Sequence, residues 1–474
     1  MAHNQGADSS KASGSPRLSR RQMLKLITAG AVGMPVAALL NACGGAAAPA
    51  SNAPAAANAP TAASAPASGN STSGVTLRGV FLPATWGTVT KEVIAADFTK
   101  QTGIKVEIDL IGRDAIHDRM GTLFAAKDAS YDIFNIDYNW VPEFSRANHL
   151  VPLDDVVGAD SDFLPKALEV ARYNGKLYGV PQTVHPHLLW YRKDLFDEAG
   201  MKPPTTMDEW LKAVQFFQDK EMGGQKVYGW AAQSAKGFGN VHTWLTFLYS
   251  FGGDTFNNYT DLQPTLNTPE AIAGTEFWAQ MMKYTPPGIN DYTYDEVTND
   301  AASGKIATCL QWSWGAFAVD DPKTSKTVGK WEFVKVPAAK ASVPHLAEWV
   351  VAVSSYSKNR DAALQFIKYL ESPENDVKQA LLGGGDPVRV ASYTNKQLTE
   401  AKVESAPDVL RFRRYPKVLE AMQTAKPRPL FPQEEHWETV VSAPLHAIQL
   451  GQSSVQDGLA KAQSDVEQML KELA

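Results

Sequence analysis

The residues of this 474-residue sequence that could do covalent chemistry stand in no recognised catalytic arrangement. It contains no Walker A phosphate loop, no serine-hydrolase G-x-S-x-G motif and no zinc-binding H-E-x-x-H motif. Cys309 lies in an apolar segment, so we expect a buried thiol rather than a nucleophile. His185 and His187 lack a third metal ligand nearby, and only two cysteines are present. We therefore expect no enzyme, no metal site and no cofactor.

Aromatic and polar side chains instead gather where predicted strands end. Trp86 follows an apolar strand, and Asp137 and Asn139 stand at the end of another. Open α/β sheets bind ligands at the carboxyl ends of their strands. Indoles suit the apolar faces of a hydroxyl-bearing ligand, while carboxylates and amides suit its polar rim. The alternatives are core packing for Trp86 and a turn or helix cap for the polar pair.

The elements that must position these residues alternate between strand and helix. In chain order they are a strand over 75–82, a helix over 89–101, a strand over 104–110 and a strand over 131–137. Thr206 and Glu209 form a capping box before a further helix, and an apolar stripe predicts a last helix over 455–470. This order predicts an α/β fold with a largely parallel sheet.

The N-terminal region has the features of an export signal. Residues 1–42 are typical of a twin-arginine lipoprotein signal peptide, with Arg20 and Arg21 before a Gly/Ala-rich apolar stretch. Leu40-Asn41-Ala42-Cys43 resembles a lipobox, which predicts lipidation of Cys43. Residues 43–74 carry no charge and form an Ala/Pro/Ser-rich tether. We expect an exported protein held on the outer face of a bacterial cytoplasmic membrane through Cys43 alone.

The charge balance argues against polyanionic partners. The sequence has 45 basic and 51 acidic residues, a formal charge of −6. Removal of residues 1–42 takes away five basic groups and one acid, which leaves −10. Negative net charge disfavours nucleic acid and anionic lipid surfaces. We expect no nucleic-acid partner.

Seven short segments, in chain order, resemble the family 1 extracellular solute-binding proteins, which serve ABC importers of sugars and related polyols. These segments are 102–106, 131–134, 148–153, 175–181, 189–196, 304–307 and 357–370. The resemblance implies a two-lobed, type II periplasmic-binding-protein-like α/β fold, in which each lobe is a mostly parallel sheet flanked by helices. It implies a three-crossing hinge near 184–190, 349–353 and 386–391. The approximate lobes are 75–186 plus 320–388 and 187–319 plus 389–474.

The same resemblance implies further ligand-binding residues. Trp314 stands ten residues after Gly304, where the family places a sugar-stacking aromatic residue, and Trp312 is its near neighbour. Trp437 occupies a position where relatives also stack sugars. The remaining candidates are Trp349, Arg389 and His187 at the crossings, although family members often carry an acid and an arginine where His185 and His187 stand. Core packing is the alternative for the tryptophans, and a salt bridge to Asp386 is the alternative for Arg389.

These observations predict the substrate-binding protein of a carbohydrate ABC importer. It would act as a monomer, capture a mono- or oligosaccharide or polyol between its lobes, and deliver it unchanged to the permease subunits. A secreted lipoprotein enzyme acting on glycans is one alternative. A receptor of the same fold for a non-sugar solute is the other.

Overall fold

The computed structural model describes residues 74–158, 162–259 and 261–473. The predicted signal peptide, Cys43 and all of the tether except Gly74 lie outside these residues. The described residues belong to one compact unit that runs from Thr72 to Ala474. No helix in the described ranges is both long enough and apolar enough to cross a membrane.

The first lobe is built on three neighbouring strands. These are β1 (Thr76–Phe81), β2 (Lys105–Leu110) and β3 (Ile133–Asp137), with β1 parallel to both others. Helices flank them, namely α2 (Thr85–Val89), α3 (Ala95–Thr102), α4 (Arg113–Ala125), α5 (Val141–Arg146), α6 (Asp154–Val157), α7 (Pro165–Val170), α14 (Arg360–Leu370) and α15 (Pro373–Leu381). A π-helical turn over 90–94 joins α2 to α3. Gly103, with φ +76°, ends α3 as predicted.

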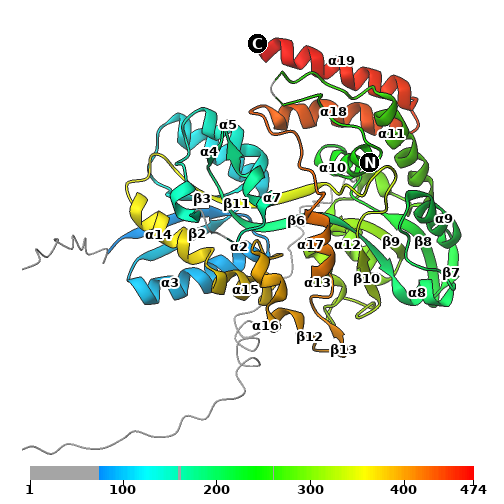
Figure 1. Cartoon of the computed structure of the whole chain (residues 1–474), viewed down its shortest axis with the longest axis horizontal. Coiled ribbons are helices and arrows are strands. Elements are labelled where there is room, and N and C mark those ends of the chain that lie inside the picture. The colour runs from blue at the N-terminus through cyan, green and yellow to red at the C-terminus, as the bar shows by residue number, and fades with distance from the viewer. Residues whose placement is uncertain (1–73, 159–161, 260, 474) are drawn as a thin grey trace, which may run out of the picture. The chain divides into compact units, whose positions relative to one another are not determined.

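Two long strands carry the sheet from the first lobe into the second. All thirteen residues of β6 (Val180–Arg192) are buried, as expected for a strand covered on both faces. Its first half pairs with β11 (Leu346–Val353), and its second half pairs with β9 (Ile306–Trp312) and β10 (Trp331–Val334). The result is a nine-stranded sheet in the order β2-β1-β3-β11-β6-β9-β8-β7, with β10 on β6. Figure 1 shows β6 and β11 running between the two groups of helices.

The two-lobed α/β class is confirmed, but the sheet is mixed rather than mostly parallel. Only β1–β2, β1–β3 and β8–β9 are parallel among its pairs in the described residues. Because β11 returns the chain along β6 in the opposite direction, the pairs at the crossing are antiparallel. The exact lobe boundaries stay a prediction. However, β10 pairs with the second-lobe half of β6, so the return to the first lobe comes later than residue 320.

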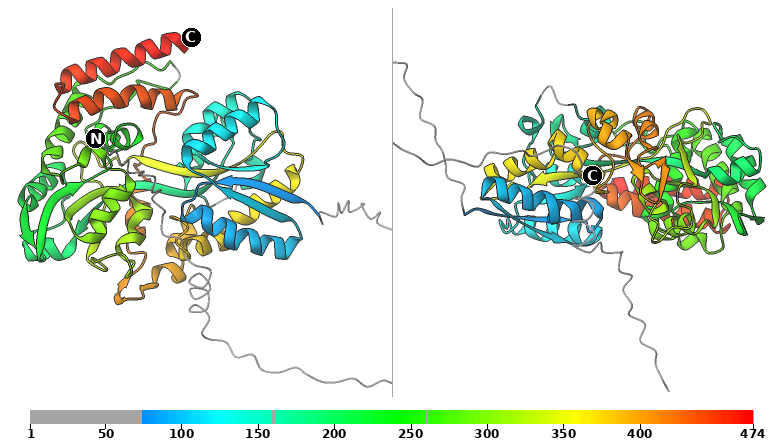
Figure 2. Two further views of the ribbon diagram at one scale, coloured as in Figure 1. Left: turned by 180° about the vertical axis from the view of Figure 1, so that it is seen from behind. Right: turned by 90° about the horizontal axis from the view of Figure 1, so that it is seen from below.

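The second lobe surrounds β7 (Lys220–Met222), β8 (Gln225–Ala231) and β9. Its helices are α8 (Lys193–Glu198), α9 (Met207–Phe217), α10 (Phe238–Ser250), α11 (Pro269–Met281), α12 (Tyr294–Ser303), α13 (Ala316–Val319), α18 (Glu434–Gln449) and α19 (Val455–Leu473). The predicted capping box of Thr206 and Glu209 begins α9. Buried Trp210, Trp230 and Trp244 belong to the main core of this lobe. Helices α18 and α19 lie side by side over it (Figure 2).

The remaining short elements follow the third crossing or form hairpins. They are α16 (Lys396–Thr399), α17 (Tyr415–Met422) and the hairpins β4–β5 (Arg172–Tyr173 and Lys176–Leu177) and β12–β13 (Lys402–Val403 and Ala406–Leu410). At the crossing itself, Asp386 bridges to Val184 of β6. Gly385 has φ +105°, and a Cβ there would stand 2.1 Å from Thr183 Oγ1, so only glycine fits.

Candidate functional site

Three indoles from different elements meet at the junction of the lobes. Trp86 comes from α2 directly after β1, Trp349 from β11, and Trp314 from the short turn over 313–315 after β9. The ring centroid of Trp86 lies 5.3 Å from that of Trp314, edge to face, and 6.0 Å from that of Trp349. The Trp86 Nε1–H donates to Asn135 Oδ1 at 3.2 Å, which fixes the ring. Trp86 from the first lobe and Trp314 from the second are thus in direct contact.

His185 of β6 completes this aromatic junction. Its ring lies 5.1 Å from Trp86 and 5.8 Å from Trp314, and it is 2 % exposed. Neither of its nitrogens has a hydrogen-bond partner among the described residues. Burial lowers the pKa of His185 to about 3, so the imidazole is neutral. Tyr294 of α12 stacks on the other side of Trp314, with centroids 4.8 Å apart. We call Trp86, His185, Trp314 and Trp349 the aromatic junction.

His187 and Trp312 form a second group just inside the second lobe. They are paired across β6 and β9, and their ring centroids are 3.9 Å apart. His345 and His242 pack against Trp312 at 5.5 and 5.7 Å. Burial lowers the pKa of all three histidines, so they are neutral. No local pattern in the sequence marks His242 or His345, because each is isolated along the chain and is brought to Trp312 only by the fold.

Asp137 and Asn139 lie at the predicted rim but are already bound to protein groups. Arg428, which is fully buried, approaches both Asp137 oxygens and Asn139 Oδ1 at 2.9 Å. Arg113 of α4 donates to Asp137 Oδ2 at 3.0 Å. Arg113 also pairs with Glu435 at the start of α18. Asp137 is therefore the centre of an ion network that joins the first lobe to α18.

Helix α18 supplies the acids of this network. Arg428 donates to Glu438 at 2.7 Å, and Glu435 accepts from Asn139 and from Trp140 Nε1 at 2.8 and 2.6 Å. Burial raises the pKa of Glu434 to about 8, and Glu438 adds to the rise. Burial acts in the same direction on Glu435, but Arg113 and Arg428 outweigh it and hold its pKa well below the ordinary value.

Two predicted residues are not brought to the junction. Arg389 forms an ion pair with Asp162 and lies 4.0 Å over the ring of Phe163, because the chain bridges Phe163 at this position. Its expected alternative partner, Asp386, is taken by Arg414. Trp437 is fully buried in the second-lobe core beside Phe256, since it lies on the apolar face of α18.

Comparison with known proteins supplies the family. A model of the bacterial extracellular solute-binding proteins matches residues 84–377. The chain belongs to this family. One relative, named a probable amino-acid ABC transporter periplasmic-binding protein of Sinorhizobium fredii, is 26 % identical over 70 % of this chain and 77 % of its own.

Solved structures of solute-binding proteins share the fold. A ribitol complex from Agrobacterium radiobacter K84 has a TM-score of 0.74 and 25 % identity, covering 84 % of this chain and 99 % of its own. A maltose-bound protein of T. maritima has a TM-score of 0.73 and 25 % identity, covering 83 % and 100 %.

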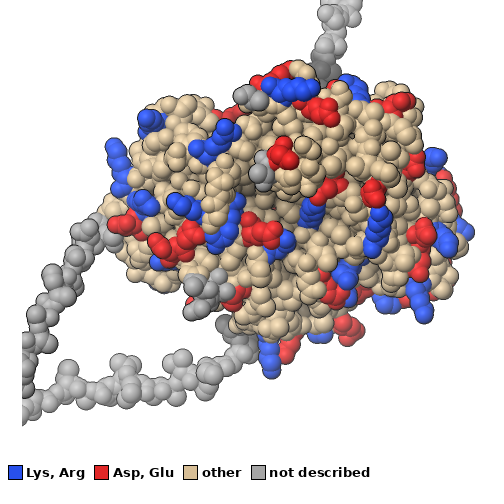
Figure 3. Space-filling view, turned by 45° about the horizontal axis from the view of Figure 1, so that its top comes forward, with Lys and Arg blue, Asp and Glu red and all other residues tan. Residues whose placement is uncertain are grey.

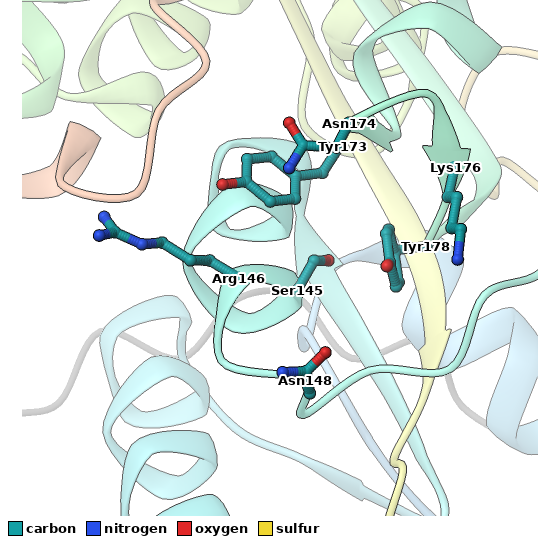
Figure 4. A pocket seen from close by; sticks show the side chains of 7 residues that line it. All are labelled: Ser145, Arg146, Asn148, Tyr173, Asn174, Lys176 and Tyr178. Carbon is teal, nitrogen blue, oxygen red and sulfur yellow. The ribbon is translucent and has the colours of Figure 1, made fainter.

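Other features of this solute-binding protein lie away from the junction. A pocket of about 280 Å³ opens between α5 and the β4–β5 hairpin (Figure 4); its lining residues are Ser145, Arg146, Asn148, Tyr173, Asn174, Lys176 and Tyr178. No group of three His, Cys, Asp or Glu side chains within the described ranges is arranged so that it could hold a metal ion. Cys309 is buried as predicted, which raises the pKa of its thiol. On the face drawn in Figure 3, acidic and basic side chains are interspersed.

Proposed function

We propose that this protein is the substrate-binding component of an ABC importer and that it captures a polyol or sugar at the aromatic junction. The observation that carries the proposal is the meeting of indoles from both lobes around a neutral, unpartnered imidazole. Indole faces suit the C–H faces of a carbohydrate, and His185 offers one donor and one acceptor to hydroxyls. The similarity to proteins solved with ribitol and with maltose supports the same ligand class.

The charge of the junction argues for a neutral ligand. An amino acid presents an ammonium and a carboxylate, and burying both requires charged partners for each. His185 is neutral, and the nearby carboxylate of Asp137 is held by Arg113 and Arg428. The charge of Asp386 is already balanced by Arg414. We therefore favour a hydroxyl-bearing solute, although one relative bears an amino-acid transporter name.

Lobe movement would give the ligand access. Because Trp86 and Trp314 touch, a guest between them requires the lobes to separate about β6, β11 and the third crossing. Ligand contacts with both lobes would then favour the closed state, which the permease recognises. A dissociation constant of about 1 μM corresponds to about −8.2 kcal/mol. Aromatic contacts contribute about 0.5–1.5 kcal/mol each beyond area burial, and the ligand leaves chemically unchanged.

We also propose that the mature protein is a monomeric lipoprotein exported by the twin-arginine route and attached through Cys43. About 30 uncharged residues would give the tether a reach of about 30 Å, enough for the body to meet a permease in the same membrane. The test is cell fractionation. Wild-type protein should follow the membranes and Cys43→Ala should not; equal distribution of both would remove the anchor from the proposal.

A thermal-shift panel tests the ligand class. Ribitol, D-mannitol and maltose are compared with glycine and glutamate, and a ligand at 100 times its dissociation constant stabilises by about 2.7 kcal/mol. The Trp314→Ala variant should bind at least about tenfold more weakly, whereas Phe216→Ala, at an exposed ring, should bind as wild type does. Stabilisation by the amino acids alone would overturn the proposal. Chemical analysis of the recovered ligand distinguishes a receptor, which returns it intact, from a glycan-cleaving enzyme.

A further inference from the structure

A second group of polar atoms lies beside the aromatic junction, at the third crossing. Ser313 precedes Trp314 in the turn after β9, and Asp386 bridges to Val184, the neighbour of His185. Ser313 is fully buried, and Asp386 is 1 % exposed. Ser313 Oγ, Asp386 Oδ2 and both nitrogens of His185 form no hydrogen bond of ordinary geometry in the described part of the chain, although the Ser313 hydroxyl lies close enough to Asp386 to lower the pKa of its carboxyl. Buried polar atoms are seldom left unpaired, so these atoms are available to a ligand that enters beside the indoles.

Asp386 is held in place by Arg414, which binds only one of its two carboxylate oxygens. Arg414 Nε and Nη2 both approach Asp386 Oδ1, at 3.1 and 2.5 Å. The guanidinium carbon of Arg414 lies 4.8 Å over the ring of Phe317 and 4.9 Å over that of Tyr415. Packed against these rings, Arg414 fixes the carboxylate and leaves Oδ2 unused. Burial raises the pKa of Asp386, while Arg414 and the neighbouring Ser313 hydroxyl oppose the rise.

The backbone before Asp386 passes close to both lobes. A Cβ at Gly383 would stand 3.7 Å from Thr85 Cγ2 and 4.0 Å from a ring carbon of Phe317. Thr85 is adjacent to Trp86 in α2, and Phe317 belongs to α13, three residues after Trp314. Thr183 Oγ1 donates to the Asp386 carbonyl oxygen at 3.2 Å. The loop is therefore fixed to β6 and lies against residues that flank the indoles of both lobes in the sequence.

We propose that Asp386, Ser313 and His185 form the part of the site that recognises hydroxyl groups, and that Arg414 is the residue that positions Asp386. The inference rests on the proposed function and narrows its ligand to a neutral solute with neighbouring hydroxyls. One hydroxyl donates to Asp386 Oδ2, and a second exchanges hydrogen bonds with Ser313 and His185. Because a charge-assisted hydrogen bond is about twice as strong as a neutral one, Asp386 is the main determinant of specificity.

The first test uses a substitution that leaves the fold intact. Ser313→Ala removes a hydroxyl that forms no hydrogen bond of ordinary geometry in the described residues and acts on Asp386 only as a close neighbour, so the melting temperature of the free protein should change little. Its affinity for the best ligand among ribitol, D-mannitol and maltose should fall about fivefold by calorimetry. Ser145→Ala is the matched control, because Ser145 Oγ is equally buried and unpartnered but lines the pocket on the first lobe. Its affinity should equal that of wild type.

The second test is Asp386→Asn, which keeps an oxygen for Arg414 but removes the charge. Affinity should fall about tenfold or more. A form of the same ligand that lacks the hydroxyl bound by Asp386 should bind wild type more weakly than the full ligand does. Asp386→Asn should bind this monodeoxy form and the full ligand with nearly equal affinity. A merely structural role of Asp386 would not produce this difference. If wild type binds a panel member and both variants bind it equally well, the inference fails and the proposed function stands. If wild type binds no panel member, the proposed function fails and the inference with it.

Discussion

Replacing Arg428 with methionine should destabilise the fold strongly, because it removes a buried cation that joins the two lobes. The Arg428 side chain has no exposed surface, and its guanidinium donates to Asp137, Asn139 and Glu438. Methionine keeps most of the apolar stem but leaves Asp137 and Glu438 without this buried cation. Arg113 still contacts Asp137, but it does not reach Glu438 by any hydrogen bond among the described residues.

The magnitude follows from the cost of an uncompensated buried charge. Breaking a buried pair by removing one partner costs about 3–5 kcal/mol. For a body of about 400 residues, an unfolding entropy of about 2.1 cal/mol/K per residue gives about 0.84 kcal/mol/K. The melting temperature should therefore fall by about 4–6 °C. Arg428→Lys, which keeps the charge but loses the planar fork, should fall between wild type and Arg428→Met.

The assay is scanning calorimetry of the ligand-free protein, supported by urea unfolding. Lys461→Met is the matched control: Lys461 pairs with Asp465 four residues along α19, and its side chain is 66 % exposed. Removing such a surface pair should change stability by no more than about 0.5 kcal/mol. A melting temperature for Arg428→Met within about 1 °C of the control would refute the view that this network is a compensated buried cluster.

Two further predictions concern the hinge and acid stability. Gly385→Ala should destabilise by about 1–3 kcal/mol, since the new Cβ would collide with Thr183 at a positive φ. Gly121→Ala, at an exposed helical position of α4 with open space around it, should not destabilise in the same urea titration. His187, with its pKa lowered to about 3, is neutral when folded but takes a proton when unfolded below about pH 6.5. As the pH falls from 6.5 to 3, His187 should therefore lower the unfolding free energy by about 1.4 kcal/mol per pH unit. In His187→Phe the unfolding free energy should fall less steeply over this range. The same slope in wild type and variant would contradict a neutral, buried His187.

The sequence was most informative where a short-range signal sufficed. Trp86 was placed correctly at the end of a strand because the apolar run before it and the helix after it are local patterns. The capping box at Thr206 and the glycine stop at Gly103 are equally local. The mixed sheet was missed, because strand direction at the crossing depends on how β11 returns to β6 across more than 150 intervening residues.

The ion network shows what the sequence could not supply. Arg428 and Asp137 are 291 residues apart, and nothing in either neighbourhood specifies the other. Trp437 is the opposite case, because a local signal was present. Val441 and Leu445 follow it at helical spacing, which indicates a core stripe, but the resemblance placed a ligand contact there.

The lobes meet at two neighbouring groups of side chains, the aromatic junction and the ion network. Trp349 of the aromatic junction and Asp137 of the ion network are paired residues of β11 and β3. The ion network therefore adjoins the place where the lobes part when Trp86 separates from Trp314. During this opening the buried charges must either stay paired or become exposed to water. If they stay joined, opening is a rotation about this edge. If they separate, the network sets the barrier to ligand entry, and Glu435→Gln should raise the association rate constant, measured by stopped-flow tryptophan fluorescence. An unchanged rate constant would assign the network to the hinge rather than to the part that opens.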